Sequence, residues 1–327
     1  MMEKPLLIFI NKGSGGGLGA ELAKMVEGKS DIYPVILPDE QDTWTSKYSD
    51  VMNNPELRAI AAGGDGTVNW AITLLTKAYT QDFHPPLAVI PFGTGNDMSR
   101  SIGWGTGMNK KSLANIFEHL EKIRNSQIQK NVDIWEITIK KKDSEEVVSH
   151  QMLNYFSLGV DASIAADYES IRKEVKPKSQ FESLFLYVPA AIKNSFGKKL
   201  LSEYLDVQLH DFNGHPEPIA LKPSSIHKTL VFLSTKTIYG GKELWKGTAP
   251  CEMDDGFAEV ILIGGFKSLT AITAGMNLST PYGQVKGATI TSKSDCFYQI
   301  DGEAMYIDAP ATFEFKHKRT YPFLFGQ

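Results

Sequence analysis

Three glycine-rich turns in the first third of the chain each follow a short apolar run. Glycine permits positive φ and leaves its amide bare, so successive N–H groups can converge on an anion. A helix that begins after each turn adds the positive end of its dipole. One such turn is explained as well by a tight strand–helix connection, but three at one sheet edge predict a phosphate-binding site. The turns read Asn11-Lys12-Gly13-Ser14-Gly15-Gly16-Gly17-Leu18-Gly19, Gly63-Gly64-Asp65-Gly66-Thr67 and Pro91-Phe92-Gly93-Thr94-Gly95-Asn96-Asp97.

Acidic side chains stand inside the second and third turns. Asp65 would repel phosphates unless a cation intervened, so its position implies Mg²⁺ or a polarised water. Asn96 and Asp97 repeat this pattern in the third turn. Asp65 and Asp97 could instead cap the helices that follow them, as Asp often does. This alternative is stronger for Asp97, which directly precedes Met98.

A third acidic position is the tripeptide Asp301-Gly302-Glu303, which follows a short apolar run. A carboxylate at this position could have a functional role. Asp-Gly is also the usual residue pair of a hairpin turn, and from these residues alone the turn is favoured. Asp254-Asp255-Gly256 is similarly ambiguous, between an ordinary turn between strands and another structural role.

Other chemistries have weaker support. The first turn contains Gly15-x-Gly17-x-x-Ala20, and Asp39 and Glu40 follow the next apolar run where a ribose-binding acid would lie. This pattern predicts an NAD(P)-dependent oxidoreductase, but it gives no role to the other two turns. The chain contains no Walker loop, no Gly-x-Ser-x-Gly elbow, no His-Arg-Asp kinase motif and no histidine spacing typical of a metal site.

The elements that carry the turns alternate between strand and helix. We expect strands over 6–10, 32–37, 57–62 and 87–91 and helices over 21–26 and 68–79. This order predicts a parallel sheet whose turns gather at the carboxyl ends of the strands, where open α/β sheets bind ligands.

From Asn131 onward, short runs rich in β-branched and aromatic residues are separated by turns, which predicts an antiparallel β-sandwich. We expect the α/β nucleotide-binding domain over 1–130, rejoined by 310–327, the sandwich domain over 131–309, and the active site in the cleft between them. The strands are expected over 132–140, 151–158, 203–210, 228–233, 258–263, 284–291 and 297–300, with helical inserts at 163–175 and 181–199.

Composition limits the location and the partners. The chain has 327 residues, with 34 Lys and Arg against 38 Asp and Glu, and therefore lacks the basic excess of a nucleic-acid binder. Two cysteines, Cys251 and Cys296, favour a reducing compartment. No apolar run approaches the ~20 residues of a membrane span, and the N-terminus does not resemble a signal peptide. Phe181–Leu201 combines aromatic side chains with lysines, which fits either membrane contact or a helix covering the sandwich.

The second and third turns, the latter extended to Arg100, resemble the catalytic-domain motifs of diacylglycerol kinases. The likeness runs from about Leu7 to Phe315, although Phe181–Tyr187 lacks the Arg and the Asn-Lys pair usual in the family. Gly-Gly-Asp-Gly alone is shared with sphingosine, ceramide and NAD kinases. The later matching motifs are, in order, Trp104-Gly105, Asn154–Ala162, Tyr239-Gly240-Gly241, Leu244-Trp245, Asp254-Asp255-Gly256 and Asp301-Gly302-Glu303.

The resemblance implies roles for the acidic residues. Asp65 would act in catalysis and, with Asp97, would hold Mg²⁺ and its water network. Asp301 would be the catalytic base that deprotonates the hydroxyl of the lipid, and Glu303 would orient Asp301 or its loop. The residues implied to bind the nucleotide are Asn11, Lys12, Gly13, Ser14, Gly63, Gly64, Gly66, Thr67, Gly93, Thr94, Gly95 and Asn96.

The function implied by the resemblance is an ATP- and Mg²⁺-dependent kinase that converts 1,2-diacylglycerol to phosphatidic acid in lipid signalling. Such an enzyme would be cytoplasmic, would contact a membrane surface transiently when active and would bind no nucleic acid; a homodimer stays open. Three alternatives also stay open: a sphingoid-base, ceramide or NAD kinase of the same superfamily, the NAD(P)-dependent oxidoreductase, and a catalytically silent nucleotide- or lipid-binding protein.

Overall fold

The structure, a computed structural model, describes residues 4–79, 83–175 and 200–326. The chain divides into two compact units, Met1–Val132 with Tyr321–Gln327 and Asp133–Thr320. The expected helix over 181–199 lies outside the described residues. In the parts that are described, no helix is both long and apolar enough to cross a bilayer.

The first unit is built on parallel strands in the order β2-β1-β3-β4, and the end of β16 pairs with β4. All residues of β3 and β4 are buried, as in parallel strands that are covered on both faces. The expected α/β architecture is confirmed, and two of the four predicted strand ranges are identical to those observed. The strands are β1 (Leu6–Asn11), β2 (Ile32–Leu37), β3 (Arg58–Gly63), β4 (Leu87–Pro91) and β16 (Ala311–Leu324).

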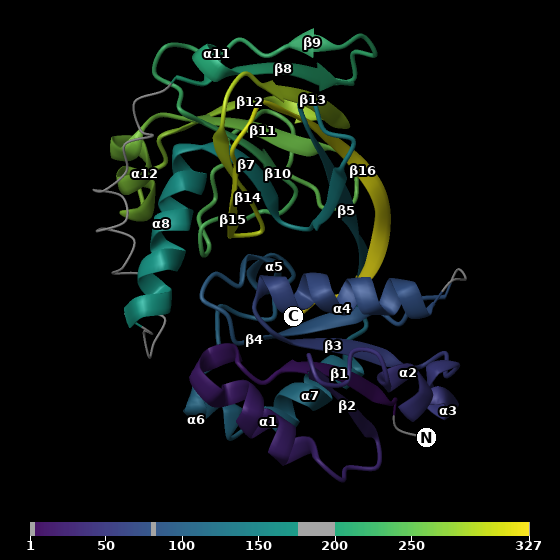
Figure 1. The fold of residues 1–327 in the computed structure, drawn as a ribbon. Coiled ribbons are helices and arrows are strands. Elements are labelled where there is room, and N and C mark those ends of the chain that lie inside the picture. The colour runs from purple at the N-terminus through teal and green to yellow at the C-terminus, as the bar shows by residue number, and fades with distance from the viewer. Residues whose placement is uncertain (1–3, 80–82, 176–199, 327) are drawn as a thin grey trace. The chain divides into compact units, whose positions relative to one another are not determined.

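Helices cover both faces of this sheet, with α4 on one face and α1 on the other (Figure 1). Helix α4 begins at Asp65, three residues earlier than the apolar period indicates, and α1 begins at Leu18. The helical segments are η1 (Ser14–Gly17), α1 (Leu18–Val26), α2 (Trp44–Lys47), α3 (Ser49–Met52), α4 (Asp65–Ala78), α5 (Asp97–Ser101), α6 (Lys110–Leu113) and α7 (Ile116–Asn125).

The second unit contains two antiparallel sheets. In one, β16, β13, β8 and β9 are neighbours, and β5 pairs with β16 and β6. The other has the order β12-β11-β10-β7-β14-β15. The additional strands are β5 (Gln129–Lys141), β6 (Val147–Met152), β7 (Tyr155–Gly159), β8 (Leu205–His210), β9 (Ile219–Ala220), β10 (Thr229–Leu233), β11 (Ala258–Ile263), β12 (Ser279–Val285), β13 (Gly287–Ser292), β14 (Cys296–Ile300) and β15 (Glu303–Ile307). The helices are α8 (Val160–Val175), α11 (Leu201–Tyr204) and α12 (Phe266–Thr273).

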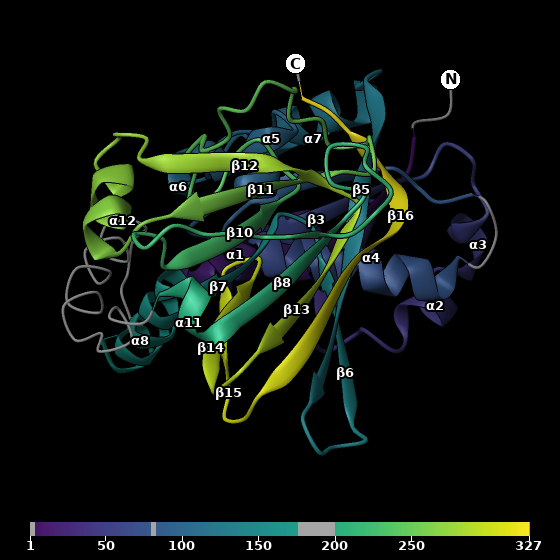
Figure 2. The same cartoon turned by 90° about the horizontal axis from the view of Figure 1, so that it is seen from above.

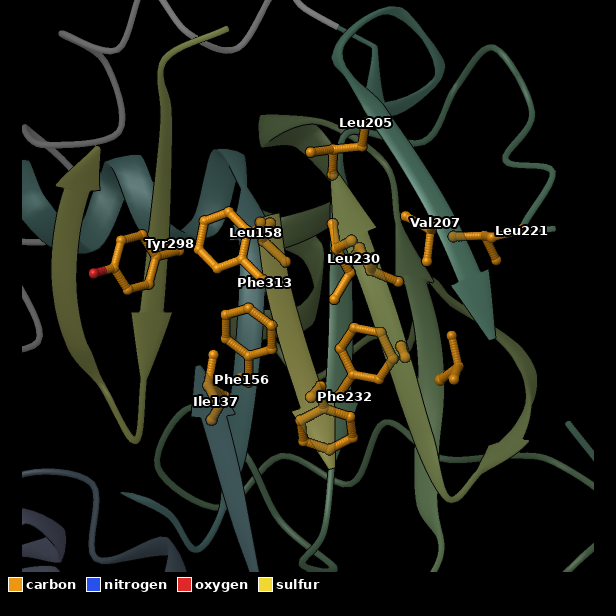
Figure 3. Close-up of a cluster of buried hydrophobic side chains, with 14 of the residues drawn as sticks. Ile137, Phe156, Leu158, Leu205, Val207, Leu221, Leu230, Phe232, Tyr298 and Phe313 are labelled. Carbon is orange, nitrogen blue, oxygen red and sulfur yellow. The ribbon is translucent and has the colours of Figure 1, made fainter. Parts of the chain in front are cut away.

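The core of the second unit lies between these sheets (Figure 3). Phe156 on β7, Phe232 on β10 and Phe313 on β16 meet there, and the ring centroids of Phe156 and Phe232 are 5.9 Å apart. Phe156 and Leu158 face this core, whereas Tyr155 packs in a second cluster with α8 and α12. The alternation along β7 is that of a strand packed on both faces.

Two predicted strands each combine parts of two observed strands, and a third, 203–210, begins inside α11. The range 151–158 contains the end of β6 and most of β7, and 284–291 contains the end of β12 and most of β13, with the members of each pair in different sheets. The turn residues Leu153 and Asn154 are as buried as the strands beside them, so hydrophobicity does not reveal the break. The chain also forms β15 and the long β16, which the pattern of short runs does not indicate.

The carboxyl group of Glu259 on β11 is fully buried, and Gln284 Nε2 donates a hydrogen bond to it at 3.2 Å. Burial raises the pKa of Glu259 from 4.5 to about 8. Folding therefore takes up a proton between these pH values, and Glu259 weakens the fold progressively as pH rises from about 4.5 to about 8.

We expect Glu259→Gln to leave the free energy of unfolding unchanged at pH 4. At pH 8 the variant should be more stable by an amount on the order of 2–5 kcal/mol. Denaturant unfolding at both pH values measures this difference. The exposed Glu252→Gln is the matched control and should show no pH-dependent gain. An equal effect of Glu259→Gln on stability at both pH values would contradict a raised pKa of Glu259.

Candidate active site

The first glycine turn connects β1 to α1 through the short helix η1. Gly15, Gly16 and Gly17 have φ angles of 64°, 62° and 108°, in the region that favours glycine. Asn11 Oδ1 accepts a hydrogen bond from the Gly13 amide at 3.0 Å and holds the start of the turn. These angles explain why glycines fill the turn.

The first turn contacts the second. Asn11 Nδ2, at the end of β1, donates to Thr67 Oγ1 in α4 at 3.3 Å. A Cβ atom on Gly63 would lie 2.1 Å from the same Thr67 oxygen, and one on Gly19 would lie 2.1 Å from the Asn11 carbonyl oxygen. Both glycines therefore allow a helix to start directly against the end of a strand.

The second turn contacts the third through two glycines. A Cβ atom on Gly93 would lie 2.5 Å from Gly64 Cα, so the two backbones touch. Asn96 is buried and has φ 52°; its Oδ1 accepts from the Gly93 amide at 2.9 Å, and its Nδ2 donates to the carbonyl oxygens of Gly93 and Thr106. This side chain thus holds the third turn together. A contact of Asn96 with nucleotide stays a prediction.

Asp65 joins the second turn to the helix after the third. Its Oδ2 accepts a hydrogen bond from the Asp97 amide at 3.1 Å, and its Oδ1 accepts from the Met98 amide at 3.0 Å. Asp65 is itself the first residue of α4. Asp65 therefore caps α5, although it belongs to α4. From the sequence, only α4 was considered as the helix that it caps.

The carboxylates of Asp65 and Asp97 lie close together. A Cβ atom on Gly95 would be 3.4 Å from Oδ2 of each, so these two oxygens are no farther apart than twice that distance. Asp97 is buried. Mg²⁺ is typically bound by one or two carboxylates, with water and phosphates completing its shell. The pair fits such an ion, and no group of three or more His, Cys, Asp or Glu residues suited to a metal occurs among the described residues.

The remaining predicted nucleotide-binding residues lie on the same three turns. Lys12 forms an exposed ion pair with Asp39, with 3.3 Å between Nζ and Oδ2. Glu40 accepts from the Ile36 amide at 2.8 Å and pairs with Lys47 at 2.6 Å. The two acids of the dinucleotide interpretation are therefore both engaged by the protein. Gly13 and Ser14 lie in the first turn, Gly66 in the first turn of α4, and Thr94 and Gly95 in the third glycine turn.

In the second unit, Asp301 forms the turn between β14 and β15. Its φ of 52° and that of Gly302, 88°, are those of a tight hairpin turn. The Asp301 carboxylate also accepts three hydrogen bonds from backbone amides. Its Oδ2 accepts from the Leu153 amide at 2.9 Å, and its Oδ1 accepts from the amides of Asn154 at 2.7 Å and Tyr155 at 3.1 Å. The β6–β7 connection thus fixes this carboxylate. Glu303 is exposed at the start of β15.

A buried polar cluster lies beside the Asp301 turn. Asp161 Oδ2, at the start of α8, accepts from Ser157 Oγ at 2.6 Å, Tyr239 Oη at 2.7 Å and Gln299 Nε2 at 2.7 Å. Gln299 Oε1 in turn accepts from Tyr155 Oη at 3.4 Å. Burial raises the pKa of Asp161. Sequence reasoning placed Asp161 in a family motif but gave it no role; an acid within an otherwise apolar run was the available signal.

We expect Gln299→Leu to lower the free energy of unfolding by about 1–3 kcal/mol, because Asp161 loses one buried hydrogen-bond donor. Equilibrium denaturation measures the change. Gln208→Leu, at an exposed position of β8, is the matched control and should stay within about 0.5 kcal/mol of the parent protein. Equal stability of the two variants would contradict a structural role for the cluster.

The Asp254-Asp255-Gly256 segment precedes β11 and is held as a turn. The Gly256 amide donates to Asp133 Oδ2 at 2.8 Å, and Asp255 Oδ1 accepts from the Phe257 amide at 2.9 Å. Asp65 and Asp97 belong to the first unit and Asp301 to the second. That their carboxylates meet across one cleft stays a prediction.

Comparison with known proteins gives two family matches. The diacylglycerol kinase catalytic domain matches residues 5–133, and the diacylglycerol kinase accessory domain matches residues 151–304. Diacylglycerol kinase 2 of Arabidopsis thaliana is 28% identical over 96% of this chain and 45% of its own length. The eye-specific diacylglycerol kinase of Drosophila melanogaster is 30% identical over 92% of this chain and 21% of its own length.

The chain thus spans less than half the length of these two relatives. Among solved structures, a diacylglycerol kinase from Bacillus anthracis strain Sterne matches with a TM-score of 0.53 at 17% identity, covering 100% of this chain and 98% of the other. At this identity the likeness shows a shared fold.

Proposed function

Because this chain belongs to the diacylglycerol kinase family, we propose that it transfers the γ-phosphoryl group of ATP to the free hydroxyl of 1,2-diacylglycerol, forming phosphatidic acid and ADP. The observation that carries the proposal is the joining of three glycine turns around the Asp65 and Asp97 carboxylates. The family argues against the oxidoreductase alternative.

In the proposed mechanism the first unit binds the nucleotide. The amides of the three turns and the ammonium group of Lys12 bind the phosphates, and Asp65 and Asp97 would hold Mg²⁺. Bound there, the ion would supply positive charge that neutralises the phosphates. The hydrogen bonds from the amides of Asp97 and Met98 fix the orientation of the Asp65 carboxylate.

The second unit supplies the base. As the lipid oxygen forms its bond to the γ-phosphorus and the bond to the bridging oxygen of ADP breaks, the hydroxyl proton passes to the Asp301 carboxylate. Three backbone amides hold this carboxylate in place before substrate arrives. Glu303 orients the turn. The mechanism requires one cleft between two domains: the catalytic domain, 1–130 with 310–327, and the accessory domain, 131–309. It also requires the enzyme to act as a peripheral protein at a cytoplasmic membrane face.

The test supplies labelled ATP and Mg²⁺ with separate micelles of diacylglycerol, ceramide and sphingosine, and with NAD in solution. We expect the label in phosphatidic acid, and none when Mg²⁺ is chelated. Label that enters only NAD, ceramide or sphingosine would assign the chain to another branch of the superfamily. No transfer to any acceptor would favour a silent nucleotide- or lipid-binding protein.

A further inference from the structure

Four large apolar side chains are exposed at one end of the six-stranded sheet of the second unit. The exposed fractions are 66% for Ile226, 39% for Phe266, 58% for Met276 and 53% for Leu278. We call these four residues the apolar end surface. Folding normally buries side chains of this size, and a group of them on one exposed face typically marks an interaction site.

The strand register places Ile226, Phe266 and Leu278 on neighbouring loops, and Met276 lies on the same loop as Leu278. Ile263, the last residue of β11, pairs with Thr229 of β10 and with Ser279 of β12. Ile226 therefore lies just before β10, Leu278 just before β12 and Phe266 just after β11. Since paired strands are about 4.8 Å apart, the three loops lie within about 10 Å of one another. Figures 1 and 2 both show α12 at this end of β11 and β12.

Other side chains already attach these loops to the core. Leu269 and Ile272 of α12 are buried in the cluster that covers the outer face of the sheet. Asn277 Nδ2 donates to the carbonyl oxygens of Glu243 and Leu244, each at 3.2 Å. The exposed side chains of the apolar end surface are therefore not needed to hold the loops.

The loops are also basic. Residues 221–228 and 264–279 contain Lys222, Lys228 and Lys267 and no Asp or Glu, in a chain whose net charge is −4. A Cβ atom on Gly265 would lie 3.1 Å from Lys228 Cδ, so this lysine stem runs beside the residue that precedes Phe266. Exposed apolar side chains with lysines around them are typical of protein surfaces that insert into the interface of an anionic bilayer.

We propose that the apolar end surface docks on an anionic lipid bilayer, with the four side chains in the interfacial region and the three lysines near the headgroups. The inference rests on the proposed function, because a kinase of diacylglycerol must reach a substrate that resides in the membrane. The surface is separate from the proposed base: Thr229 pairs with Gly159 at one end of β7, and the Asp301 amide donates to the Tyr155 carbonyl at the other. Changes in the surface should therefore leave the chemistry intact.

The experiment is co-sedimentation with phosphatidylcholine vesicles that contain or lack about 20 mol% phosphatidylserine. We expect binding to the anionic vesicles and a reduction of about tenfold or more for the double variant Ile226→Ser/Leu278→Ser. Lys222→Glu/Lys267→Glu should reduce binding similarly. The control Val147→Ser/Val148→Ser changes two exposed valines on β6 and should bind as the parent protein does. Equal binding by the parent protein and Ile226→Ser/Leu278→Ser would overturn the proposal.

Two activity measurements separate this proposal from the proposed function. Ile226→Ser/Leu278→Ser should phosphorylate a dispersed short-chain diacylglycerol at the parent rate and diacylglycerol in anionic vesicles more slowly. If vesicle binding depends on the apolar end surface but neither substrate is phosphorylated, the proposed kinase function is wrong and the docking proposal stands. The membrane proposal would be overturned if the parent protein were a dimer that binds no vesicles and the double variant were a monomer. That result would show that a second copy of the chain covers the apolar end surface.

Discussion

Replacing Asp301 by Asn is expected to lower kcat for diacylglycerol phosphorylation by about 10²–10⁴-fold, the usual contribution of a general base. The affinity for ATP should stay within about twofold, because the residue belongs to the lipid-proton step in the proposed mechanism. The carboxylate also accepts hydrogen bonds from three backbone amides. An amide group offers only one oxygen to them, so we expect a loss of about 1–3 kcal/mol in the free energy of unfolding as well.

Gly302→Ala separates these two effects. Gly302 has φ 88°, so alanine strains the same turn by about 1 kcal/mol while the Asp301 carboxylate is retained. Single-turnover kinetics and urea unfolding should show similar destabilisation in both variants but a large loss of kcat only in Asp301→Asn. Near-parental turnover of Asp301→Asn would remove Asp301 from the role of base.

The second large effect is expected for Asp65→Asn, which should reduce kcat/KM by about 10³-fold, because the loss of metal-held charge stabilisation is worth several kcal/mol. Unlike Asp301→Asn, this variant should also lose the dependence of ADP affinity on Mg²⁺. Stability should fall by about 1–3 kcal/mol, since the amides of Asp97 and Met98 would share a single acceptor oxygen. Calorimetric titration of ADP with and without Mg²⁺ measures the affinities.

Asp50→Asn is the matched control for Asp65→Asn. Asp50 is an exposed acid in the first turn of α3, as Asp65 is in the first turn of α4. Its replacement should cost about 0.3–1 kcal/mol through the helix dipole and should leave activity unchanged. If Asp65→Asn kept the Mg²⁺ dependence of ADP affinity, Asp65 would be a helix cap without a role in metal binding.

The sequence alone predicted the elements whose signal is local. The strands over 32–37, 87–91 and 258–263 were predicted with their observed bounds, because mainly apolar runs end at turn residues there. Positive φ was expected at the glycines of the three turns, and it is observed in the first turn but not at the glycines of the second and third. Gly15, Gly16 and Gly17 have positive φ, and Gly64 and Gly93 touch. Positive φ depends on the residue type at a single position and can be predicted from the sequence, whereas the contact between Gly64 and Gly93 joins two separate turns.

Only the tertiary structure decided what the acidic side chains contact. Asp65 accepts hydrogen bonds from amides 32 and 33 residues later, and Asp301 accepts from amides between 146 and 148 residues earlier. Every residue except proline offers the same backbone N–H, so sequence does not identify the donor. The sequence also did not reveal that 151–158 is divided between two sheets, because the residues on both sides of the bend are equally buried. Which strand ends and turns meet is set by the packing of whole sheets, and that packing fixes both carboxylates.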